Sequence, residues 1–274
     1  MASPSVLISG LGLMGGSLAA VLSTAGWRVL LHHHRPVVAQ EAQARGWGRA
    51  VDSFSAAADA DLAVVCTPVS VIAPTVRAIA AATSALITDV GSTKGGICTE
   101  LADLGPRFIG SHPMCGSHRQ GLGNADPELY RDRVALITPT ASSPAAGIER
   151  VEALWLAAGS RTLRLSPTDH DQVVAEASHL PHVLASLTAS LLSGDAAPAA
   201  AGGFRDTTRI AGAAPDLWVD ILLANRAAMR PLLTRATARL AELDQALADG
   251  DGARIRAWLA EGRAGRQRFD DAQG

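Results

Sequence analysis

The sequence predicts an α/β protein, in which an N-terminal parallel sheet is followed by an all-helical C-terminal domain. Short β-branched runs alternate with amphipathic stretches over the first half of the chain, a pattern typical of parallel strands joined by crossover helices. No strand pattern occurs after about residue 165, and apolar residues then recur at helical spacing. We therefore expect one domain over residues 1–165 and an all-helical domain over residues 166–274.

The elements of the first half follow this alternation in order. Strands are predicted at residues 6–8, 28–31, 62–66, 85–88, 107–110, 134–138 and 162–165. Helices are predicted at 14–25, 69–82 and 144–158. Each strand run is short, rich in β-branched residues and bounded by turn residues, as buried parallel strands are.

The second half begins with a helix-start signature. Ser166 can cap the helix, Pro167 suits its first position, and Asp169 lies in its first turn. This helix is predicted to run to about residue 192 with a kink at Pro181, followed by a flexible stretch over 196–203. Further helices are predicted at 215–250 and 253–269. Their apolar stripes predict a homodimer through the helical domain, with packing inside one chain as the alternative.

Composition excludes several classes of protein. The formal net charge is −2, so the chain lacks the basic excess of a nucleic-acid-binding protein. Its apolar segments are too short to cross a bilayer, and residues 1–5 do not resemble a signal peptide. Cys66, Cys98 and Cys115 have no paired spacing and are expected to be free thiols. We expect a soluble, cytoplasmic protein that acts on a small molecule.

A glycine-rich turn between the first strand and the first helix predicts a dinucleotide site. Gly10 permits the tight turn, Gly12 lets the backbone approach a pyrophosphate, and Gly15 allows close packing of the helix. The intervening residues Leu11, Leu13 and Met14 belong to the same phosphate-binding turn. In its strand–turn–helix context the motif indicates a Rossmann-type fold that binds NAD or NADP.

The end of the second strand favours NADP. An NAD site usually has an acidic residue there, whereas this chain has no Asp or Glu between residues 28 and 40. Arg35 is placed to pair with a 2′-phosphate, and His33 can add a donor. The alternative is a solvated basic loop, with NAD still possible. The three adjacent histidines alternate in direction and are not expected to bind a metal.

Two clusters at strand ends are candidates for the chemistry. Ser92 follows the strand at 85–88 and is expected to face the cofactor, or alternatively to cap a helix that begins at Thr93. His112 follows the strand at 107–110 and would share the same edge of the sheet. Histidine suits proton transfer because its pKa lies near the working pH.

The order of several motifs resembles that of the prephenate/arogenate dehydrogenase family. The motifs are GLGLMGGS (10–17), CTP (66–68), DVGSTK (89–94), HPMCGSHRQG (112–121), HDQVVAEASHLPH (170–182) and GFRDTTR (203–209). The resemblance spans nearly the whole chain, and the HPM-x-G-S, SHLPH and GFRD-x-TR elements are its most specific parts. We expect neither a fused chorismate mutase nor a C-terminal regulatory domain.

The resemblance implies roles for individual residues. His112 would accept the proton of the substrate hydroxyl, with Ser92 holding either the histidine or the hydroxyl. Arg209 would clamp a carboxylate. The resemblance also implies that Ser117, His179, His182 and Trp218 contact the substrate. Trp218 would do so by reaching into the active site of the partner subunit. Thr67 and Pro68 would contact the cofactor.

The implied reaction is an NAD(P)-dependent oxidative decarboxylation in aromatic amino-acid biosynthesis. Prephenate would give 4-hydroxyphenylpyruvate, and arogenate would give tyrosine. His118 and Arg119 stand where some relatives have an acidic residue, which favours the keto acid prephenate over the amine arogenate. A 4-amino-4-deoxyprephenate dehydrogenase of antibiotic biosynthesis would have a similar sequence.

Two further alternatives differ in class. A β-hydroxyacid dehydrogenase or imine reductase commonly uses a lysine or an acid on the first interdomain helix, but the segment 167–192 has no lysine. A non-catalytic nucleotide sensor would be expected to have lost the catalytic positions, yet Ser92, His112 and Arg209 are all present.

Overall fold

The computed structural model describes residues 3–116 and 119–273, and the chain forms two compact units, residues 1–226 and 227–274. The predicted substrate contact Ser117 and the neighbouring His118 lie outside the described residues. The first unit contains both sheets and α1 to α9, and the second contains nearly all of α10 and α11.

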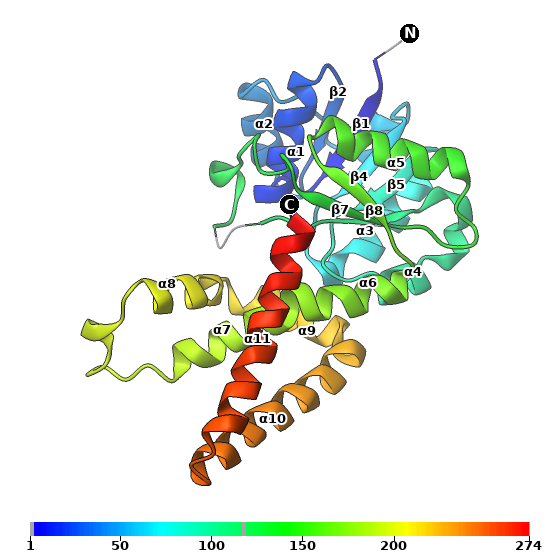
Figure 1. Ribbon diagram of the computed structural model, residues 1–274. Helices are drawn as coiled ribbons and strands as arrows, with labels where there is room; N and C mark the ends of the chain where they lie inside the picture. Colours follow the sequence, from blue (N-terminus) through cyan, green and yellow to red (C-terminus); the bar gives the residue numbers. More distant parts are fainter. Residues whose placement is uncertain (1–2, 117–118, 274) are drawn as a thin grey trace. The chain divides into compact units, whose positions relative to one another are not determined.

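A five-stranded parallel sheet forms the centre of the first unit (Figure 1). Its order is β3-β2-β1-β4-β5, and the strands are β1 (Ser5–Ser9), β2 (Arg28–His32), β3 (Arg49–Ala50), β4 (Leu62–Val65) and β5 (Leu86–Asp89). The connecting helices are α1 (Leu13–Thr24), α2 (Pro36–Ala44), α3 (Val69–Ala82) and α4 (Gly95–Glu100). The strand order reverses direction between β1 and β4, which is where sheets of this kind bind their ligands. The predicted α/β fold class is confirmed.

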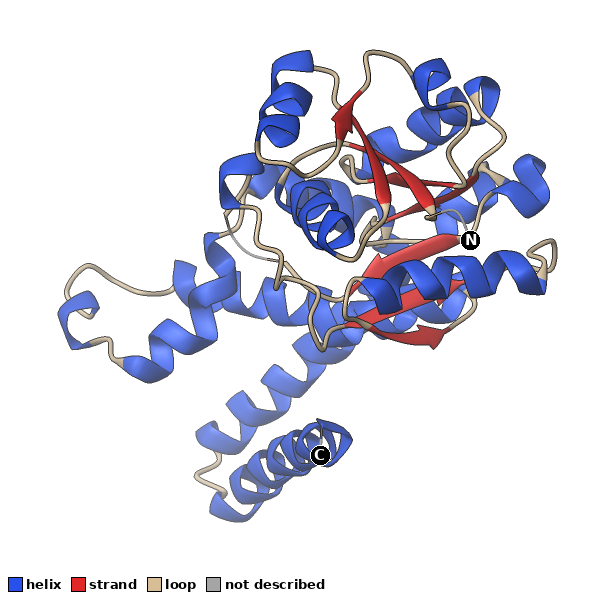
Figure 2. Ribbon diagram, turned by 90° about the horizontal axis from the view of Figure 1, so that it is seen from above, coloured by secondary structure: helices blue, strands red, loops and turns tan. Residues whose placement is uncertain are grey.

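Alternation along the strands produces two apolar layers, one on each face of the sheet. Val6 and Ile8 of β1 pack with side chains of α1, α2 and α5 (Ala145–Ala157). Leu7, between them, faces the other way and packs with side chains of α3 and α4. Figure 2 shows helices on both sides of the strands. Burial on both faces explains why these strands are continuously hydrophobic in sequence.

A second sheet of three strands corrects one predicted element. It consists of β6 (Gly110–Pro113), β7 (Val134–Thr138) and β8 (Arg161–Arg164), with β6 antiparallel to β7. The strand predicted at 107–110 is wrong, because a 3₁₀ segment continues to Arg107 through Gly105, at φ 53°, and Pro106. The strand therefore starts later, and His112 lies within it instead of after it.

The helical part of the first unit holds the predicted long helix in two pieces. They are α6 (Pro167–Val174) and α7 (Leu180–Ser190), joined by a π turn at Ala175–His179. Pro181 has no N–H to continue the regular hydrogen-bond ladder, which accounts for the irregularity where a kink was predicted. The stretch predicted as flexible contains a 3₁₀ turn, Ala197–Ala199, and the start of α8 (Gly202–Thr208).

The helix predicted over 215–250 is divided in the structure. Asn225 separates α9 (Pro215–Ala224) from α10 (Arg226–Ala248), because its backbone leaves helical geometry at φ −102° and ψ 21°. In the second unit α10 and α11 (Gly252–Gln273) form a hairpin, in which the Trp258 indole donates to the backbone oxygen of Arg239 at 2.8 Å.

Two further expectations concern the cysteines and membrane segments. Cys66, Cys98 and Cys115 are free thiols, as predicted. Burial raises the pKa of Cys98 to about 11 and that of Cys115 to about 12, so these thiols are protonated at neutral pH. Among the described residues, no helix has both the length and the apolar character needed to span a bilayer.

Candidate active site

The glycine turn has the geometry of a phosphate-binding loop. Gly10 has φ +97°, and a Cβ there would lie 2.6 Å from the backbone oxygen of Cys66. A Cβ at Gly15 would lie 1.8 Å from the backbone oxygen of Gly10, so both positions require glycine. A Cβ at Gly12 would meet nothing within 4 Å. Gly12 is also the N-cap of α1 and no side chain caps it, so this side of the turn can accommodate a phosphate.

The other predicted cofactor residues surround this turn. Leu11 is buried and anchors it, whereas Leu13 and Met14 are half-buried in the first turn of α1. Thr67 follows β4, directly across from Gly10, and its hydroxyl oxygen is buried with no hydrogen-bond partner among the described residues. Pro68 is the N-cap of α3. An unpartnered polar atom facing an open glycine turn fits a site that is completed by a polar ligand.

Basic groups lie at the end of β2, where a ribose would be expected. The backbone N–H of Arg35 donates to Nδ1 of His33 at 3.0 Å, which leaves the His33 proton on Nε2. Burial, with smaller effects from His34 and Arg35, lowers the pKa of His33, so the ring is neutral at pH 7. Arg35 is exposed and is the N-cap of α2. At the end of β2, Arg35 therefore presents a cation and His33 presents a neutral hydrogen-bond donor.

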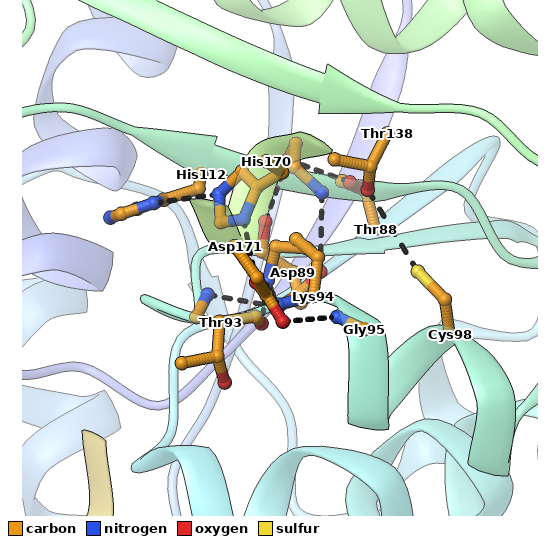
Figure 3. Close-up of polar contacts among 12 residues, drawn as sticks. Thr88, Asp89, Thr93, Lys94, Gly95, Cys98, His112, Thr138, His170 and Asp171 are labelled. Carbon is orange, nitrogen blue, oxygen red and sulfur yellow. Dashed lines mark hydrogen bonds and ion pairs between the residues drawn. The ribbon is translucent and has the colours of Figure 1, made fainter. Parts of the chain in front are cut away.

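His112 belongs to a buried chain of hydrogen bonds (Figure 3). Its Nδ1 lies 3.0 Å from Nε2 of His170, and Nδ1 of His170 lies 2.9 Å from Oδ1 of Asp171. A carboxylate only accepts, so His170 donates through Nδ1 and its Nε2 accepts the Nδ1–H of His112. This order leaves a lone pair on Nε2 of His112, the atom that a proton acceptor requires.

Asp171 also binds the start of α4. Its two carboxylate oxygens accept the backbone N–H groups of Lys94 at 2.7 Å and of Gly95 at 2.9 Å (Figure 3). Lys94 is the N-cap, so the alternative in which Ser92 caps this helix is wrong. Ser92 is half-buried in the preceding loop, and no hydrogen bond joins it to His112 among the described residues. His170 occupies the orienting position instead.

A buried ion pair supports the same loop. Nζ of Lys94 lies 2.5 Å from Oδ2 of Asp89, and both side chains are fully buried. The ammonium also donates to the backbone oxygen of Thr93 at 2.9 Å, while Oδ2 of Asp89 accepts from the Gly91 N–H at 2.8 Å. Each charge is therefore matched by a partner and by further hydrogen bonds. The pair fixes the backbone that carries Ser92.

Burial keeps the imidazoles of His112 and His170 neutral. Burial, aided by repulsion from His170, Lys94 and His179, holds the pKa of His112 well below its usual value. Burial likewise lowers the pKa of His170, although the Asp171 hydrogen bond opposes it. Burial opposes ionisation of Asp171, but its hydrogen bonds from His170, Lys94 and Gly95 outweigh this and lower its pKa. The expectation of a His112 pKa near the working pH is thus corrected to a lower value.

A second cluster consists of His179 in the π turn after α6, His182 on α7 and Trp218 on α9. His182 stacks on the Trp218 indole, with ring centroids 3.4 Å apart and an interplanar angle of 9°, and His179 meets the same ring edge-on at 5.9 Å. Trp218 therefore lies beside its own chain's histidines. Nε2 of His179 and Nδ1 of His182 are buried with no partner among the described residues. Asn225, also buried, lies 3.0 Å from Nδ1 of His179.

Arg209 is the remaining predicted substrate residue within the described ranges. It begins a 3₁₀ turn, Arg209–Gly212, immediately after α8, and its side chain is exposed. This turn packs against α7, the helix that carries His182.

Sequence reasoning did not assign roles to four residues of this network, namely His170, Asp171, Lys94 and Asn225. His170 and Asp171 lie within a recognised motif, and Lys94 is the only lysine in the chain. These signals mark the residues without indicating their partners. Nothing in the local pattern around Asn225 distinguishes it from a helical position, because the apolar periodicity continues across it.

Comparison with known proteins places both halves of the chain in one family. Residues 18–164 match the model for the prephenate dehydrogenase nucleotide-binding domain, and residues 166–261 match that for the prephenate dehydrogenase dimerization domain. A cyclohexadienyl dehydrogenase of Zymomonas mobilis is 35% identical over 262 residues, which cover 90% of this chain and 89% of the relative.

Solved structures agree in fold over the whole chain. Prephenate dehydrogenase from Aquifex aeolicus, in complex with hydroxyphenyl propionate and NAD+, is 27% identical with a TM-score of 0.88, covering 98% of this chain and 99% of that one. Synechocystis arogenate dehydrogenase is 28% identical with a TM-score of 0.84, covering 97% and 99%. With a glycine turn open to phosphate and a buried histidine ready to accept a proton, this chain belongs to the prephenate dehydrogenase family, whose members are oxidoreductases that use a nicotinamide cofactor.

Proposed function

We propose that the protein catalyses the NADP-dependent oxidative decarboxylation of prephenate to 4-hydroxyphenylpyruvate. The observation that carries the proposal is the His112–His170–Asp171 chain, which leaves Nε2 of His112 unprotonated within a buried site. Arogenate is the second candidate substrate, since an arogenate dehydrogenase shares the fold over nearly the whole chain. A 4-amino-4-deoxyprephenate substrate is a third.

His112 acts as the proton acceptor in this proposal. When bound, the nicotinamide cofactor would supply the acceptor for the hydride on C4 of the substrate. Nε2 of His112 accepts the proton of the hydroxyl on the same carbon. Loss of the ring carboxylate as CO₂ then supplies the electron pair that completes the aromatic ring and leaves a phenolate, to which His112 returns the proton. Proton transfer to the buried His112 makes a cation, which the Asp171 carboxylate stabilises through His170. Ser92, at the end of β5, is assigned to the substrate hydroxyl.

The substrate carboxylates are assigned to the helical segments. Arg209 is proposed to bind one carboxylate through its planar guanidinium, and His179 and His182 to donate to substrate from their unpartnered ring nitrogens. Trp218 supplies an apolar wall through its stack on His182. Ser117, which lies outside the described residues, is assigned to the substrate side chain.

NADP is the proposed cofactor. Gly10, Leu11, Gly12, Leu13, Met14 and Gly15 would hold the pyrophosphate, with Thr67 and Pro68 opposite. Arg35 and the Nε2–H of His33 would bind the 2′-phosphate. The preference rests on these two donors and on the absence of an acidic residue between 28 and 40.

The assembly is proposed to be a homodimer through the helical part of the chain. Residues 166–261 match a dimerization domain. Helix α7 and its C-cap expose Leu184, Leu187 and Leu191, and α9 exposes Leu217, Val219 and Leu223. Apolar patches of this kind are typical of interfaces. We retain residues 1–165 as the dinucleotide-binding domain and 166–274 as the substrate and dimerisation domain, and a cytoplasmic location as a prediction.

Reduction of the cofactor tests the proposal directly. Purified protein is mixed with prephenate, arogenate or 4-amino-4-deoxyprephenate, each with NADP or NAD, and absorbance at 340 nm is followed while the product is identified by mass spectrometry. We expect the highest kcat/KM with prephenate and NADP. A higher kcat/KM with arogenate would overturn the substrate, and one with NAD would overturn the cofactor, because His118–Arg119 and Arg35 are the respective reasons for these choices.

A further inference from the structure

Asn225 is a buried amide at the break between α9 and α10, outside every motif that the proposed reaction uses. It is 2% exposed. Its Nδ2 donates to the backbone oxygen of Asp171 at 2.8 Å and lies 3.0 Å from Nδ1 of His179. One side chain therefore connects the helix break with both histidine clusters.

The chemistry of these contacts fixes the direction of each hydrogen bond. A backbone oxygen can only accept, so the amide nitrogen of Asn225, and not its oxygen, must face Asp171. The second hydrogen of the same nitrogen then points to Nδ1 of His179, which must accept it. A neutral imidazole with a lone pair on Nδ1 carries its proton on Nε2.

Nε2 of His179 is the atom left to bind something else. It is buried and has no hydrogen-bond partner among the described residues, and His179 is 1% exposed. The titratable groups that act on this ring are Asp171 and His170 on α6, His182 on α7 and His112 on β6. The carboxylate of Asp171 is already occupied by three donors, from Lys94, Gly95 and His170. Nε2–H is thus a donor for which the described residues supply no acceptor.

We propose that Asn225 is a positioning residue that holds His179 in its Nε2–H tautomer, so that His179 binds a substrate carboxylate oxygen as a neutral donor. This role rests on the proposed function, because it deepens the assignment of His179 to the substrate. A neutral donor suits the site because a positive charge on His179 would repel the proton that His112 has to accept.

The tautomer can be measured without substrate or turnover. In protein labelled with ¹⁵N-histidine, the ¹⁵N shifts of His179 at pH 7.5 report which nitrogen is protonated, and loss of signals in His179→Gln assigns them. We expect Nδ1 unprotonated and Nε2 protonated. Asn225→Asp keeps the shape but offers only acceptors, so it should reverse the tautomer. Asn124→Asp, the same change at an exposed asparagine, is the matched control and should leave His179 unchanged.

Kinetics then separate positioning from a structural role. At pH 8, Asn225→Asp should raise the KM for prephenate about tenfold or more, with a much smaller change in kcat and none in the Kd for NADP. The carboxylate also raises the pKa of His179, so lowering the pH restores Nε2–H and should reduce the KM again. A purely structural defect would raise KM at every pH.

Several outcomes would overturn the inference. A His179 signal with Nδ1–H in the unmodified protein would do so directly, as would an Asn225→Asp protein that keeps Nε2–H. Should Asn225→Asp not fold, Asn225→Ala serves instead, and a His179 tautomer that remains entirely Nε2–H in that variant counts against the role of Asn225. Absence of any turnover with prephenate would contradict the proposed function, whereas the tautomer result stands independently of it.

Discussion

Replacement of His170 by leucine tests the hydrogen-bond chain behind His112. The substitution removes the acceptor for Nδ1–H of His112, 3.0 Å away, at a side chain that is fully buried. A buried donor without a partner costs about 1–3 kcal/mol, so the tautomer with the proton on Nε2 becomes favoured. That tautomer cannot accept the substrate proton. We expect kcat to fall by about 5- to 150-fold, since each 1.36 kcal/mol corresponds to a factor of ten.

The assay is steady-state reduction of NADP at 340 nm with prephenate, together with cofactor binding and thermal unfolding. The KM for prephenate and the Kd for NADP should change little, because the contacts of His170 are with His112 and Asp171. Asp171 keeps its bonds to Lys94 and Gly95, so the start of α4 should remain intact.

His170→Gln is the matched control. Glutamine has a size similar to that of leucine, but its amide can donate to Asp171 and accept from His112, as the imidazole does. We expect it to recover most of the activity that leucine loses. A His170→Leu protein that folds normally and keeps kcat within twofold of the unmodified enzyme would refute the argument, as would equal losses in both variants.

Three further predictions address the remaining roles. His112→Asn should lower kcat by about 10²–10⁴-fold with little change in substrate affinity, and unchanged turnover would exclude His112 as the proton acceptor. Arg35→Ala should weaken NADP binding by about 1.5–3 kcal/mol and NAD binding hardly at all, measured by titration of tryptophan fluorescence; equal losses for both cofactors would contradict a 2′-phosphate contact. Burial lowers the pKa of His179 from 6.5 to about 4, so between these values the unfolded state binds the extra proton. The contribution of neutral His179 to the free energy of unfolding should be complete above pH 6.5 and decline by about 3 kcal/mol towards pH 4. Urea midpoints that do not fall on acidification would count against this prediction.

The nucleotide-binding half could be predicted well because its signals are local. The helix expected at 69–82 and the strand expected at 134–138 have these same bounds in the structure, since each contains a complete periodic pattern. The predicted bounds of strands and helices were wrong where one or two residues changed the backbone conformation. Gly105 and Pro106 displaced the strand that carries His112, and Asn225 divided a helix whose apolar stripe continues without interruption. The short strand β3, with two residues, is too small to leave a pattern.

The sequence indicated which types of residue form the candidate site, but it did not indicate which of them contact one another. Motifs drew attention to His112, yet its partner His170 is 58 positions away, and no spacing rule relates them. The Nδ1 contact of His179 comes from Asn225, 46 positions further along the chain. Such contacts arise only when α6 lies beside β6 and the π turn after α6 lies beside the end of α9, so they depend on tertiary structure that a single sequence does not display.

The electrostatics of the site follow from these long-range contacts. The fixed charges are all paired or hydrogen-bonded: Lys94 with Asp89, and Asp171 with His170 and with the backbone N–H groups of Lys94 and Gly95. Burial lowers the pKa values of His112, His170, His179 and His182 alike, so all four rings are neutral at pH 7. Neutral imidazoles differ from one another only in which nitrogen is protonated. The hydrogen bond to Asp171 sets this for His170 and through it for His112, and we propose that Asn225 sets it for His179. In the proposed mechanism, proton acceptance by His112 and donation by His179 therefore depend on tautomers fixed by hydrogen bonds, and we expect both to persist across the neutral pH range.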